Sequence, residues 1–585
     1  MRLYYSQSSG RLKKITDNLK LAAKKDNYRF IQQSLGHGLY TTIEIEKRKA
    51  GRKKRCSLCA SAVKTYMDTI KKEIGVATFE KFIGAKDRVT LMFVIDDTGS
   101  MSSEIHSAKA IATYIVNHPR PNTEVDFVLS PFNDPKTGPI KRMEAGKGAE
   151  FIKAIAALSA HGGGDCPELT FRGIIDALNE GVQDDSPLYV FTDATAKDAT
   201  PENIELARVM AMSKRSSVYF FATGLCGKSK YEPFEYLATE TCGQIFELPK
   251  HSSDLSKMSK ISKGLLGGSS CASRSGVDPF GKKKRSASSS VYKLLIDDSM
   301  EKVIVSVTTQ NSGPKIDLVD PLGVSFSSGK TSLTKGAIFE VDRPKPGIWK
   351  LVVSSGAGKH SYLIKASGKT NVDFDFVFAI PRKWMSPLPI SHPLIGKTAH
   401  AILIVRAADK IRGTSLNLEI LSKDDKVLTT TSVNPVGTSG AHFSVSFPTP
   451  TVPFKLQLRG KTKKNFDFER NSRNIVHPGR VLVRVLYAGH EFTVPTKGTV
   501  LVVFFVYNTD ATEKFDFKVK DSTKFNHSVL WYSAVRVYKN RSGFFYVRFS
   551  AKSPATPGAA DDVVVTATGR RSKVSVNHVF SLMVA

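Results

Sequence analysis

The sequence predicts a multidomain protein in which an α/β domain with a doubly wound parallel sheet precedes all-β sandwich domains. The chain has 585 residues, too many for one ordinary hydrophobic core. Between residues 86 and 262, short apolar runs alternate with helical patterns, as in a parallel sheet that carries helices on its faces. From residue 291 onward, apolar residues recur with period two between Gly and Pro turns, which is typical of β-sandwiches.

The composition is that of a globular protein with a large positive charge. Hydrophobic residues make up 41% and charged residues 24% of the chain, both ordinary values for globular domains. The net charge of +31 favours anionic partners such as glycosaminoglycan, nucleic acid or an acidic membrane surface, and lysine used for solubility explains it equally well. No apolar run reaches the length of about eighteen residues that would indicate a membrane span.

Residues 1–85 form a basic segment in which the spacing of apolar residues favours helix. Its first ten residues hold no apolar stretch of signal-peptide length, which taken literally argues against secretion. Residues 47–55 include seven basic residues in nine, the composition of a nuclear address or a heparin-type patch, and also of a solvated loop. Residues 60–83 read as one or two amphipathic helices that lead into the first strand of the α/β domain.

The stretch from Val89 to residue 103 organises the α/β domain. Its apolar run to Ile95 predicts a strand buried on both faces, and the pattern from residue 102 to 117 predicts a helix. Between them lie the oxygen-bearing side chains of Asp96, Thr98 and Ser100. The carboxyl end of a strand is where an open α/β sheet places its ligand crevice, and alternating oxygen ligands suit a hard cation such as Mg2+.

The remaining elements of this domain follow from the same patterns. Strands are expected at 124–130, 188–193, 217–223 and 244–248, and helices at 151–158, 169–178, 201–212 and 231–240. A Gly-rich loop, Gly-Gly-Gly-Asp-Cys-Pro-Glu, covers residues 162–168, and Asp193 ends the strand that begins at 188. Asp97 and Glu168 read as solvent-facing loop acids.

Three loops in this order resemble the metal-ion-dependent adhesion site of von Willebrand factor A (vWA) domains. That family uses an Asp-x-Ser/Thr-x-Ser loop, a Thr from a second loop and an Asp from a third. The resemblance implies a metal site made by Asp96, Thr98, Ser100, Asp165 and Asp193. Asp165 stands where the family usually has Thr. Its added negative charge would strengthen metal binding, shift the preference of the site toward Ca2+ or change the bound state.

The sequence is similar to the hemicentin branch of vWA proteins in particular. The form of the loop at 162–168 carries this similarity, and so do residues 344–351, 358–364 and 372–378, which resemble the segment that follows the vWA domain in hemicentins. The resemblance implies a non-enzymatic adhesion protein of the extracellular matrix or cell surface. Its Mg2+, or Ca2+ or Mn2+, would keep an open coordination position for an acidic residue of a protein ligand.

The expected domain boundaries follow the changes in pattern. The vWA domain covers 86–262, a Gly/Ser/Lys linker 263–290, a hemicentin-type β-sandwich 291–385, a β-rich domain 386–475 and an immunoglobulin-like β-sandwich 476–585.

The cysteines and the sequons bear on the compartment. Six cysteines in this length are no disulfide scaffold. Cys226 and Cys242 flank the helix expected at 231–240 and would pair in an oxidising compartment or stay reduced in the cytosol. Asn526 and Asn540 head two N-glycosylation sequons, which favour the cell exterior.

Two other functions compete with adhesion. The chain would be a polyanion binder, for nucleic acid or glycosaminoglycan, if the basic segment at 47–55 carries the function and the vWA domain is a scaffold. It would be a hydrolase if Asp96, Asp165 and Asp193 hold a catalytic metal, but no general base with a supporting partner stands out. The sequence does not indicate an oligomeric state.

Overall fold

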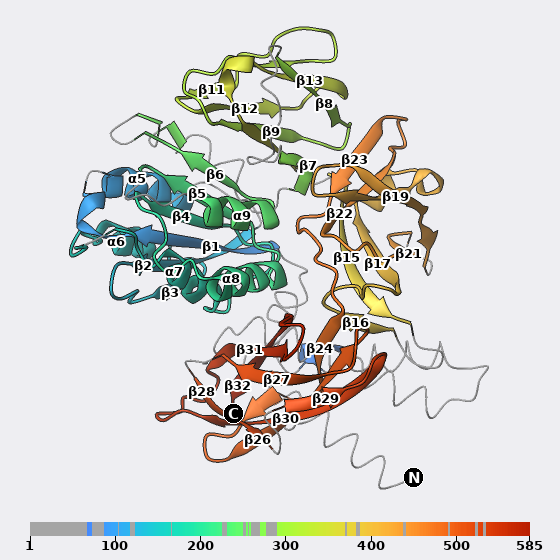
Figure 1. Ribbon diagram of the computed structural model, residues 1–585. Coiled ribbons are helices and arrows are strands. Elements are labelled where there is room, and N and C mark those ends of the chain that lie inside the picture. Colours follow the sequence, from blue (N-terminus) through green and yellow to red (C-terminus); the bar gives the residue numbers. More distant parts are fainter. Residues whose placement is uncertain are drawn as a thin grey trace.

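The computed structural model shows an α/β domain packed against three β domains (Figure 1). It describes residues 67–68, 70–72, 87–102, 104–117, 123–164, 166–224, 231–249, 253–254, 257–258, 270–276, 289–368, 371–381, 387–436, 440–488, 492–520, 524–530 and 534–585. The predicted fold class, an α/β domain followed by all-β domains, is confirmed. The basic run at 47–55 lies outside the described residues.

The α/β domain is built on a six-stranded sheet of order β3-β2-β1-β4-β5-β6. Its strands are β1 (Asp87–Asp96), β2 (Thr123–Phe132), β3 (Lys141–Met143), β4 (Leu188–Thr192), β5 (Val218–Ala222) and β6 (Gln244–Glu247). All neighbours pair in parallel except β2 and β3. The chain therefore builds the sheet outward from β1 in one direction and then from β4 in the other.

Helices cover both faces of this sheet. They are α5 (Glu104–Asn117), α6 (Gly148–Ala156), α7 (Thr170–Leu178), α8 (Pro201–Ser213) and α9 (Glu232–Glu240), with a 3-10 turn η1 (Gly99–Met101). Alternate residues of β1 point to opposite faces: Phe93 packs in the core with α5 and α6, and Val94 in the core with α7, α8 and α9. This two-sided burial explains why β1 is a nearly continuous apolar run.

The second domain contains a strand where the sequence indicates a linker. Its sheets have the orders β10-β13-β8 and β11-β12-β9-β14-β7. The strands are β7 (Ser270–Gly276), β8 (Ser290–Ile296), β9 (Lys302–Thr309), β10 (Ile316–Val319), β11 (Lys330–Leu333), β12 (Gly336–Asp342), β13 (Gly347–Val353) and β14 (His360–Ser367). The linker expected at 263–290 is wrong for residues 270–276, because β7 pairs with β14 along the sheet edge.

The third domain begins before the expected boundary. Its sheets have the orders β16-β15-β17-β21-β20 and β19-β18-β22-β23. The strands are β15 (Asp373–Ile380), β16 (Leu388–Ile390), β17 (Thr398–Arg406), β18 (Asn417–Ser422), β19 (Val427–Ser432), β20 (Asn434–Pro435), β21 (His442–Pro448), β22 (Phe454–Lys461) and β23 (Asp467–Asn471). Because β15 pairs with β17 and β16, it belongs to this domain and not to the preceding one, which we expected to reach residue 385.

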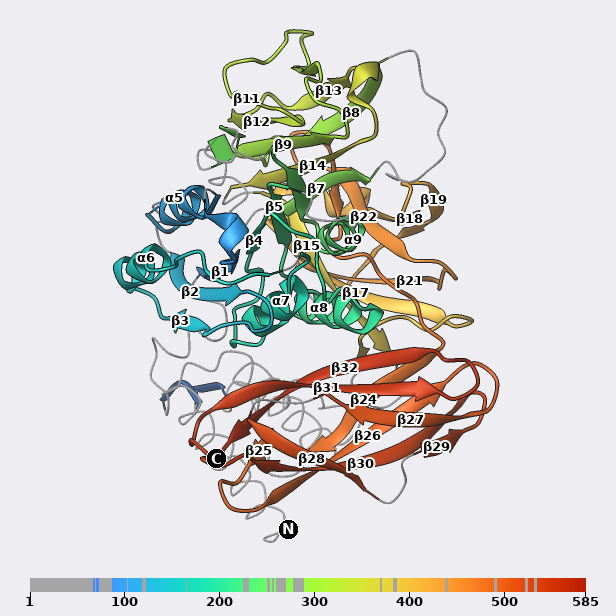
Figure 2. The ribbon, with the colours of Figure 1, turned by 60° about the vertical axis from the view of Figure 1, so that its left-hand side comes forward.

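The fourth domain is a two-sheet sandwich whose strands run across the view in Figure 2. Its sheets have the orders β24-β26-β30-β28 and β25-β32-β31-β27-β29. The strands are β24 (Val481–Ala488), β25 (Thr493–Val494), β26 (Thr499–Asn508), β27 (Glu513–Val519), β28 (Phe525–Leu530), β29 (Ala534–Val537), β30 (Arg541–Ala551), β31 (Ala560–Gly569) and β32 (Ser575–Val584). Phe504 and Phe580 come from opposite sheets and pack together in the core.

A helical stretch before the α/β domain packs against the last domain. Ile70 is 0% exposed and lies in the core of the fourth domain, with Met67 packed beside it. The amphipathic pattern at 60–83 led us to expect a helix that enters β1. Of this range the structure describes residues 67–68 and 70–72, whose Met67 and Ile70 pack in the fourth domain; the rest of the expected helix lies outside the described residues.

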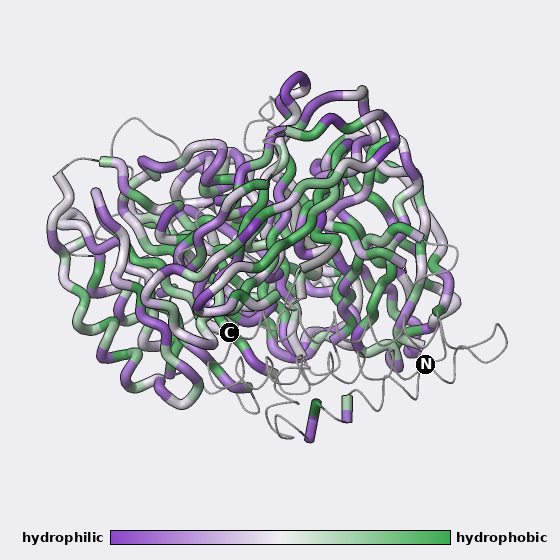
Figure 3. Tube along the Cα trace, turned by 90° about the horizontal axis from the view of Figure 1, so that it is seen from below, coloured by the Kyte–Doolittle hydropathy of each residue, from purple (hydrophilic) through white to green (hydrophobic). Residues whose placement is uncertain are grey.

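Buried or half-buried contacts join the α/β domain to each β domain. A disulfide links it to the second domain, Arg473 of the third domain pairs with Asp185 at 2.9 Å, and Asp562 of the fourth pairs with the buried Lys214 at 2.8 Å. Figure 3 shows the hydrophobic stretches running through the middle of the molecule and hydrophilic loops at its periphery. None of the helices in the described ranges has both the length and the apolar character needed to span a membrane.

Candidate metal centre

The candidate centre lies where β1 and β4 end side by side. Asp96 is the last residue of β1, and Asp193 directly follows β4. These adjacent parallel strands mark the point at which the sheet order changes direction. Loops diverge there and leave room for a ligand beyond the carboxyl ends of the strands.

Four of the five predicted residues come together in a chain of oxygen contacts. The Thr98 hydroxyl donates to Asp96 Oδ1 at 2.6 Å and lies 3.2 Å from Ser100 Oγ. Ser100 Oγ in turn donates to Asp193 Oδ1 at 3.0 Å. The fifth residue, Asp165, lies outside the described residues.

Thr192 is a member of the site that the sequence analysis missed. Its hydroxyl donates to Asp96 Oδ2 at 2.7 Å, while the backbone N–H of Thr98 donates to Asp96 Oδ1 at 3.0 Å. Both carboxylate oxygens of Asp96 are therefore held in place. Thr192 directly precedes Asp193, but a Thr inside a strand reads first as a β-forming residue.

The centre is buried at its base and open at Ser100. Asp96 is 0%, Thr98 1% and Asp193 4% exposed, whereas Ser100 is exposed. An ion seated on the buried oxygens would thus have a route to solvent on the Ser100 side.

Burial raises the pKa of Asp96 to about 6, although hydrogen bonds from Thr98 and Thr192 act to lower it. The nearby charge of Asp193 adds to the rise. Removing a carboxylate from water without a counter-charge disfavours its ionised form. The hydrogen-bond partners of Asp96 are neutral, so a cation at this position would supply the charge that the ionised form needs.

The donor set fits a hard divalent cation. The described residues hold no group of three or more His, Cys, Asp or Glu side chains placed to bind a metal. The centre instead offers two carboxylates and two hydroxyls. Oxygen donors with few charges suit Mg2+, Mn2+ or Ca2+, which complete their shells with water, and suit zinc less well.

The Gly-rich second loop lies directly against the first loop. The N–H of Gly99 donates to the carbonyl of Gly162 at 3.2 Å. A Cβ on Gly163, whose φ is +71°, would lie 3.1 Å from Thr98 Cβ. Glycines therefore allow the approach of the two loops.

Asp97 and Glu168 are buried, which corrects their expected place as solvent-facing acids. Asp97 is 6% and Glu168 2% exposed. Asn133 Nδ2 donates to Asp97 Oδ1 at 3.0 Å, and the N–H of Glu168 donates to the Thr195 carbonyl at 2.9 Å. Asp97 thus ties the first loop to Asn133, and Glu168 ties the end of the second loop to Thr195.

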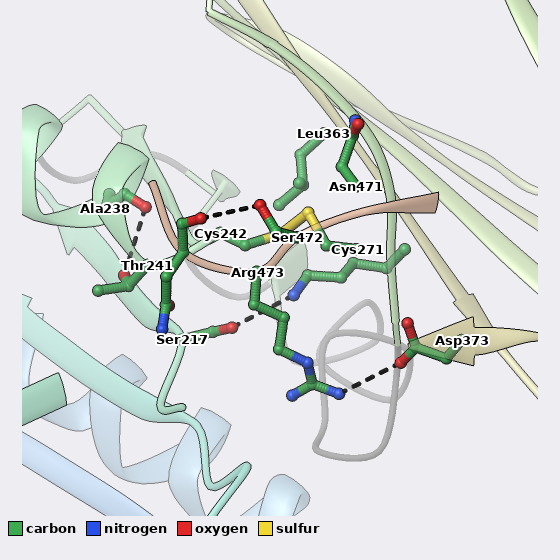
Figure 4. The surroundings of a disulfide bond; sticks show 12 residues. Ser217, Ala238, Thr241, Cys242, Cys271, Leu363, Asp373, Asn471, Ser472 and Arg473 are labelled. Atoms are coloured by element: carbon green, nitrogen blue, oxygen red, sulfur yellow. Dashed lines mark hydrogen bonds and ion pairs between the residues drawn. A yellow bond between two sulfur atoms is a disulfide. The ribbon is translucent and has the colours of Figure 1, made fainter. Parts of the chain in front are cut away.

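The predicted pairing of Cys226 with Cys242 is wrong for Cys242. Its partner is Cys271 on β7, and both sulfurs are buried (Figure 4). Cys271 was overlooked because it lies in the Gly/Ser-rich stretch read as a linker. Cys226 lies outside the described residues.

Comparison with protein-family models gives two matches. Residues 90–250 match the von Willebrand factor A domain, and residues 279–371 match the hemicentin galactose-binding domain-like family.

The curated relatives include hemicentins. Hemicentin-2 of Mus musculus is 27% identical over 428 residues, which covers 71% of this chain and 8% of that protein. Hemicentin-1 of Homo sapiens is 28% identical over 402 residues, 66% of this chain and 7% of that protein. Von Willebrand factor A domain-containing protein 7 of Rattus norvegicus is 26% identical over 56% of this chain and 37% of its own length. The chain thus spans less than a tenth of the hemicentins it matches.

Two solved structures that are similar to part of this chain are the following. The vWA domain of SpRpn10 is 16% identical, with a TM-score of 0.24, and covers 31% of this chain and 96% of that one. Proximal thread matrix protein 1 from the mussel byssus, described with a zinc-occupied MIDAS motif, is 15% identical with a TM-score of 0.23 and covers 31% of this chain and 48% of that one.

Proposed function

We propose that this hemicentin-like vWA protein is a non-enzymatic, divalent-cation-dependent adhesion protein of the extracellular matrix or cell surface. The observation that carries the proposal is the run of oxygen contacts from Asp96 through Thr98 and Ser100 to Asp193 at the carboxyl ends of β1 and β4.

The residues divide into charged and neutral donors. Asp96 and Asp193 would supply the negative charge, and Thr98 and Ser100 the neutral oxygens, with Asp165 as a further donor, direct or through water. A bound Mg2+, Ca2+ or Mn2+ supplies a Lewis-acidic position for the carboxylate of an acidic residue on a protein partner. Asp96 and Asp193 alone would balance the charge of such an ion and leave it attractive to an anion, whereas a direct bond to Asp165 would add one negative charge.

The chain's own side chains prepare this position. Thr98 and Thr192 fix the two oxygens of Asp96, and burial keeps water from competing for them. Asn133 braces the first loop through Asp97 and the second through the carbonyl of His161, at 2.8 Å. Preformed donors lose little conformational freedom when an ion binds.

An extracellular location is supported by the cysteines and the sequons. The disulfide between Cys242 and Cys271 is of a kind that persists in oxidising compartments. Asn526 and Asn540 are both exposed, so each sequon is accessible to glycosylation.

A paired-peptide binding assay tests the adhesion mechanism. Peptides that carry one Glu or Asp, and matched peptides with Gln or Asn, are titrated onto the full chain with Mg2+ or with EDTA. We expect binding of acidic peptides only, lost with EDTA and in Asp193→Ala. Equal binding of the amide peptides, or metal-dependent release of phosphate or peptide fragments, would contradict a non-enzymatic adhesion site.

A further inference from the structure

Basic side chains gather at one end of the fourth domain, on strands and turns far apart in the sequence. They lie on β27, on β29 and the turn after it, at the start of β30, and on the turn between β31 and β32. All are exposed. This basic end consists of Lys514, Arg536, Lys539, Arg541, Arg570, Arg571 and Lys573.

Backbone contacts show that these positions adjoin one another. Lys514 on β27 lies directly opposite Arg536 on β29. The N–H of Arg570 donates to the carbonyl of Lys514 at 2.9 Å, and the N–H of Lys539 donates to Thr512 Oγ1 at 3.1 Å. The two turns are therefore fixed against the same end of the sheet.

Acidic residues within the basic end neutralise only a small part of it. Asp516 accepts from Arg570 at 2.8 Å, and the Arg570 guanidinium and then Lys573 hold the pKa of Asp516 below its usual range. Glu513 is 9% exposed and accepts from the N–H groups of Arg571 and of its neighbour at 3.1 Å, so it fastens the turn. Seven basic side chains against these two carboxylates leave a formal excess of five positive charges.

The arrangement costs stability in the absence of an anion. Like charges directly opposite on neighbouring strands, such as Lys514 and Arg536, repel each other. Protection of an edge strand against pairing with other chains explains charge on β29, but it does not explain three further cations on the turn from Arg570 to Lys573. An anionic partner across both turns would relieve the repulsion.

We propose that the basic end binds a sulfated polysaccharide of the glycosaminoglycan class. Arginine matches sulfate and carboxylate oxygens with its planar fork, and cations spread over two turns suit a chain of repeated anionic groups. Tyr538, two residues after Arg536 and 60% exposed, offers a flat ring to a sugar. The disulfide argues for a compartment in which such polysaccharides, and not nucleic acids, are the abundant polyanions.

This surface is separate from the candidate metal centre. The metal centre belongs to the α/β domain, while the basic end belongs to the fourth domain. The polysaccharide should therefore bind equally well with EDTA present. If the metal centre binds no ion, polysaccharide binding can still be tested, and loss of the polysaccharide proposal leaves the metal proposal untouched.

The test measures binding of the full chain to heparin and to chondroitin sulfate at about 0.15 M salt, where exposed charges act over only about 8 Å. The test variant combines Arg536→Gln, Lys539→Gln and Arg571→Gln. The control variant removes the same charge from exposed positions of the second and third domains, by Lys315→Gln, Lys350→Gln and Lys397→Gln. Every protein also carries Asn540→Gln, because a glycan at that sequon would stand among these cations.

We expect the test variant to lose at least about tenfold in affinity and to show a shallower dependence on salt, while the control stays within about twofold of the parent. Equal loss in both variants would overturn the site, because net charge alone would then explain binding. Tighter binding of single- or double-stranded DNA than of heparin would overturn the ligand class. Thermal unfolding of each variant verifies that the fourth domain remains folded.

Discussion

At the scale of single residues, the candidate centre depends on Asp96, a fully buried carboxylate held by two neutral hydroxyls. The pattern of a buried strand followed by a polar loop predicted Asp96, Thr98 and Ser100, and the resemblance to vWA domains added Asp193; the structure brings these four together. The sequence was not enough to find the burial of Asp97, since an acid in a polar loop reads as exposed until its amide partner, 36 residues away, is known.

Thr192→Val tests whether the missed hydroxyl orients Asp96. Valine keeps the shape of threonine but leaves Asp96 Oδ2 without its donor. We expect the affinity for Mg2+ to fall roughly tenfold, as for partners that orient metal ligands in other proteins, with the fold retained. Isothermal titration calorimetry gives the affinity, and an unchanged value would show that Thr192 plays no part in the site.

At the scale of elements, the two loops of the centre are set by backbone conformation as much as by side chains. The Gly-rich motif at 162–168 was visible in the sequence, but the contact of Gly163 with Thr98 became visible only in the structure. Strand β7 was missed because its Ser and Gly residues resemble a linker. It is an edge strand held by main-chain hydrogen bonds to β14 and by the disulfide of Cys271. Neither interaction requires alternating apolar residues, so the sequence of β7 lacks the usual strand pattern.

The variants Gly163→Ala and Gly164→Ala compare a crowded glycine of the second loop with an uncrowded one. Alanine at 163 has a left-handed φ and crowds Thr98, whereas a Cβ at 164 meets nothing within 4 Å. We expect the first change to lower the free energy of unfolding by about 1–2 kcal/mol and to weaken metal binding, and the second to change both little. Chemical denaturation measures the first quantity. Equal effects of the two variants would contradict the close approach of the loops.

At the scale of the whole molecule, the four domains are joined by buried charged residues that no local sequence pattern predicts. Lys214 and Asp562 pair across 348 residues of sequence, and Arg470 of the third domain pairs with Asp297 of the second at 2.7 Å with neither side chain exposed. Periodicity predicted an α/β domain followed by all-β domains, because it reports which face of a helix or strand is buried. It could not predict which domain surfaces meet, since a buried ion pair looks in sequence like two surface charges.

Glu240 makes the contact between the α/β and third domains dependent on pH. Burial acts to raise its pKa, but His477 at 2.6 Å and Lys423 at 2.9 Å outweigh burial and lower the pKa below the ordinary 4.5. A carboxylate with a lowered pKa contributes stability above its unfolded-state value and loses it as the pH falls. We therefore expect unfolding to become easier as the pH drops below 4.5.

Glu240→Gln should weaken the dependence of stability on pH below 4.5. Glu202→Gln, at a largely exposed position, should leave this dependence unchanged. Thermal unfolding between neutral pH and about pH 3 measures both. A Glu240→Gln profile parallel to that of the parent chain would show that the contact does not titrate.

The central claim is that the oxygens of Asp96, Thr98, Ser100 and Asp193 bind a divalent cation. It is tested most directly by calorimetric titration of Mg2+, Mn2+ and Ca2+ into the full chain and into the double variant Asp96→Ala, Asp193→Ala. A control, Asp409→Ala with Asp467→Ala, removes two exposed carboxylates, whose side chains are 69% and 62% exposed. Binding by the parent and the control, and none by the double variant, is the predicted result. No binding by the parent chain at millimolar metal would contradict the account.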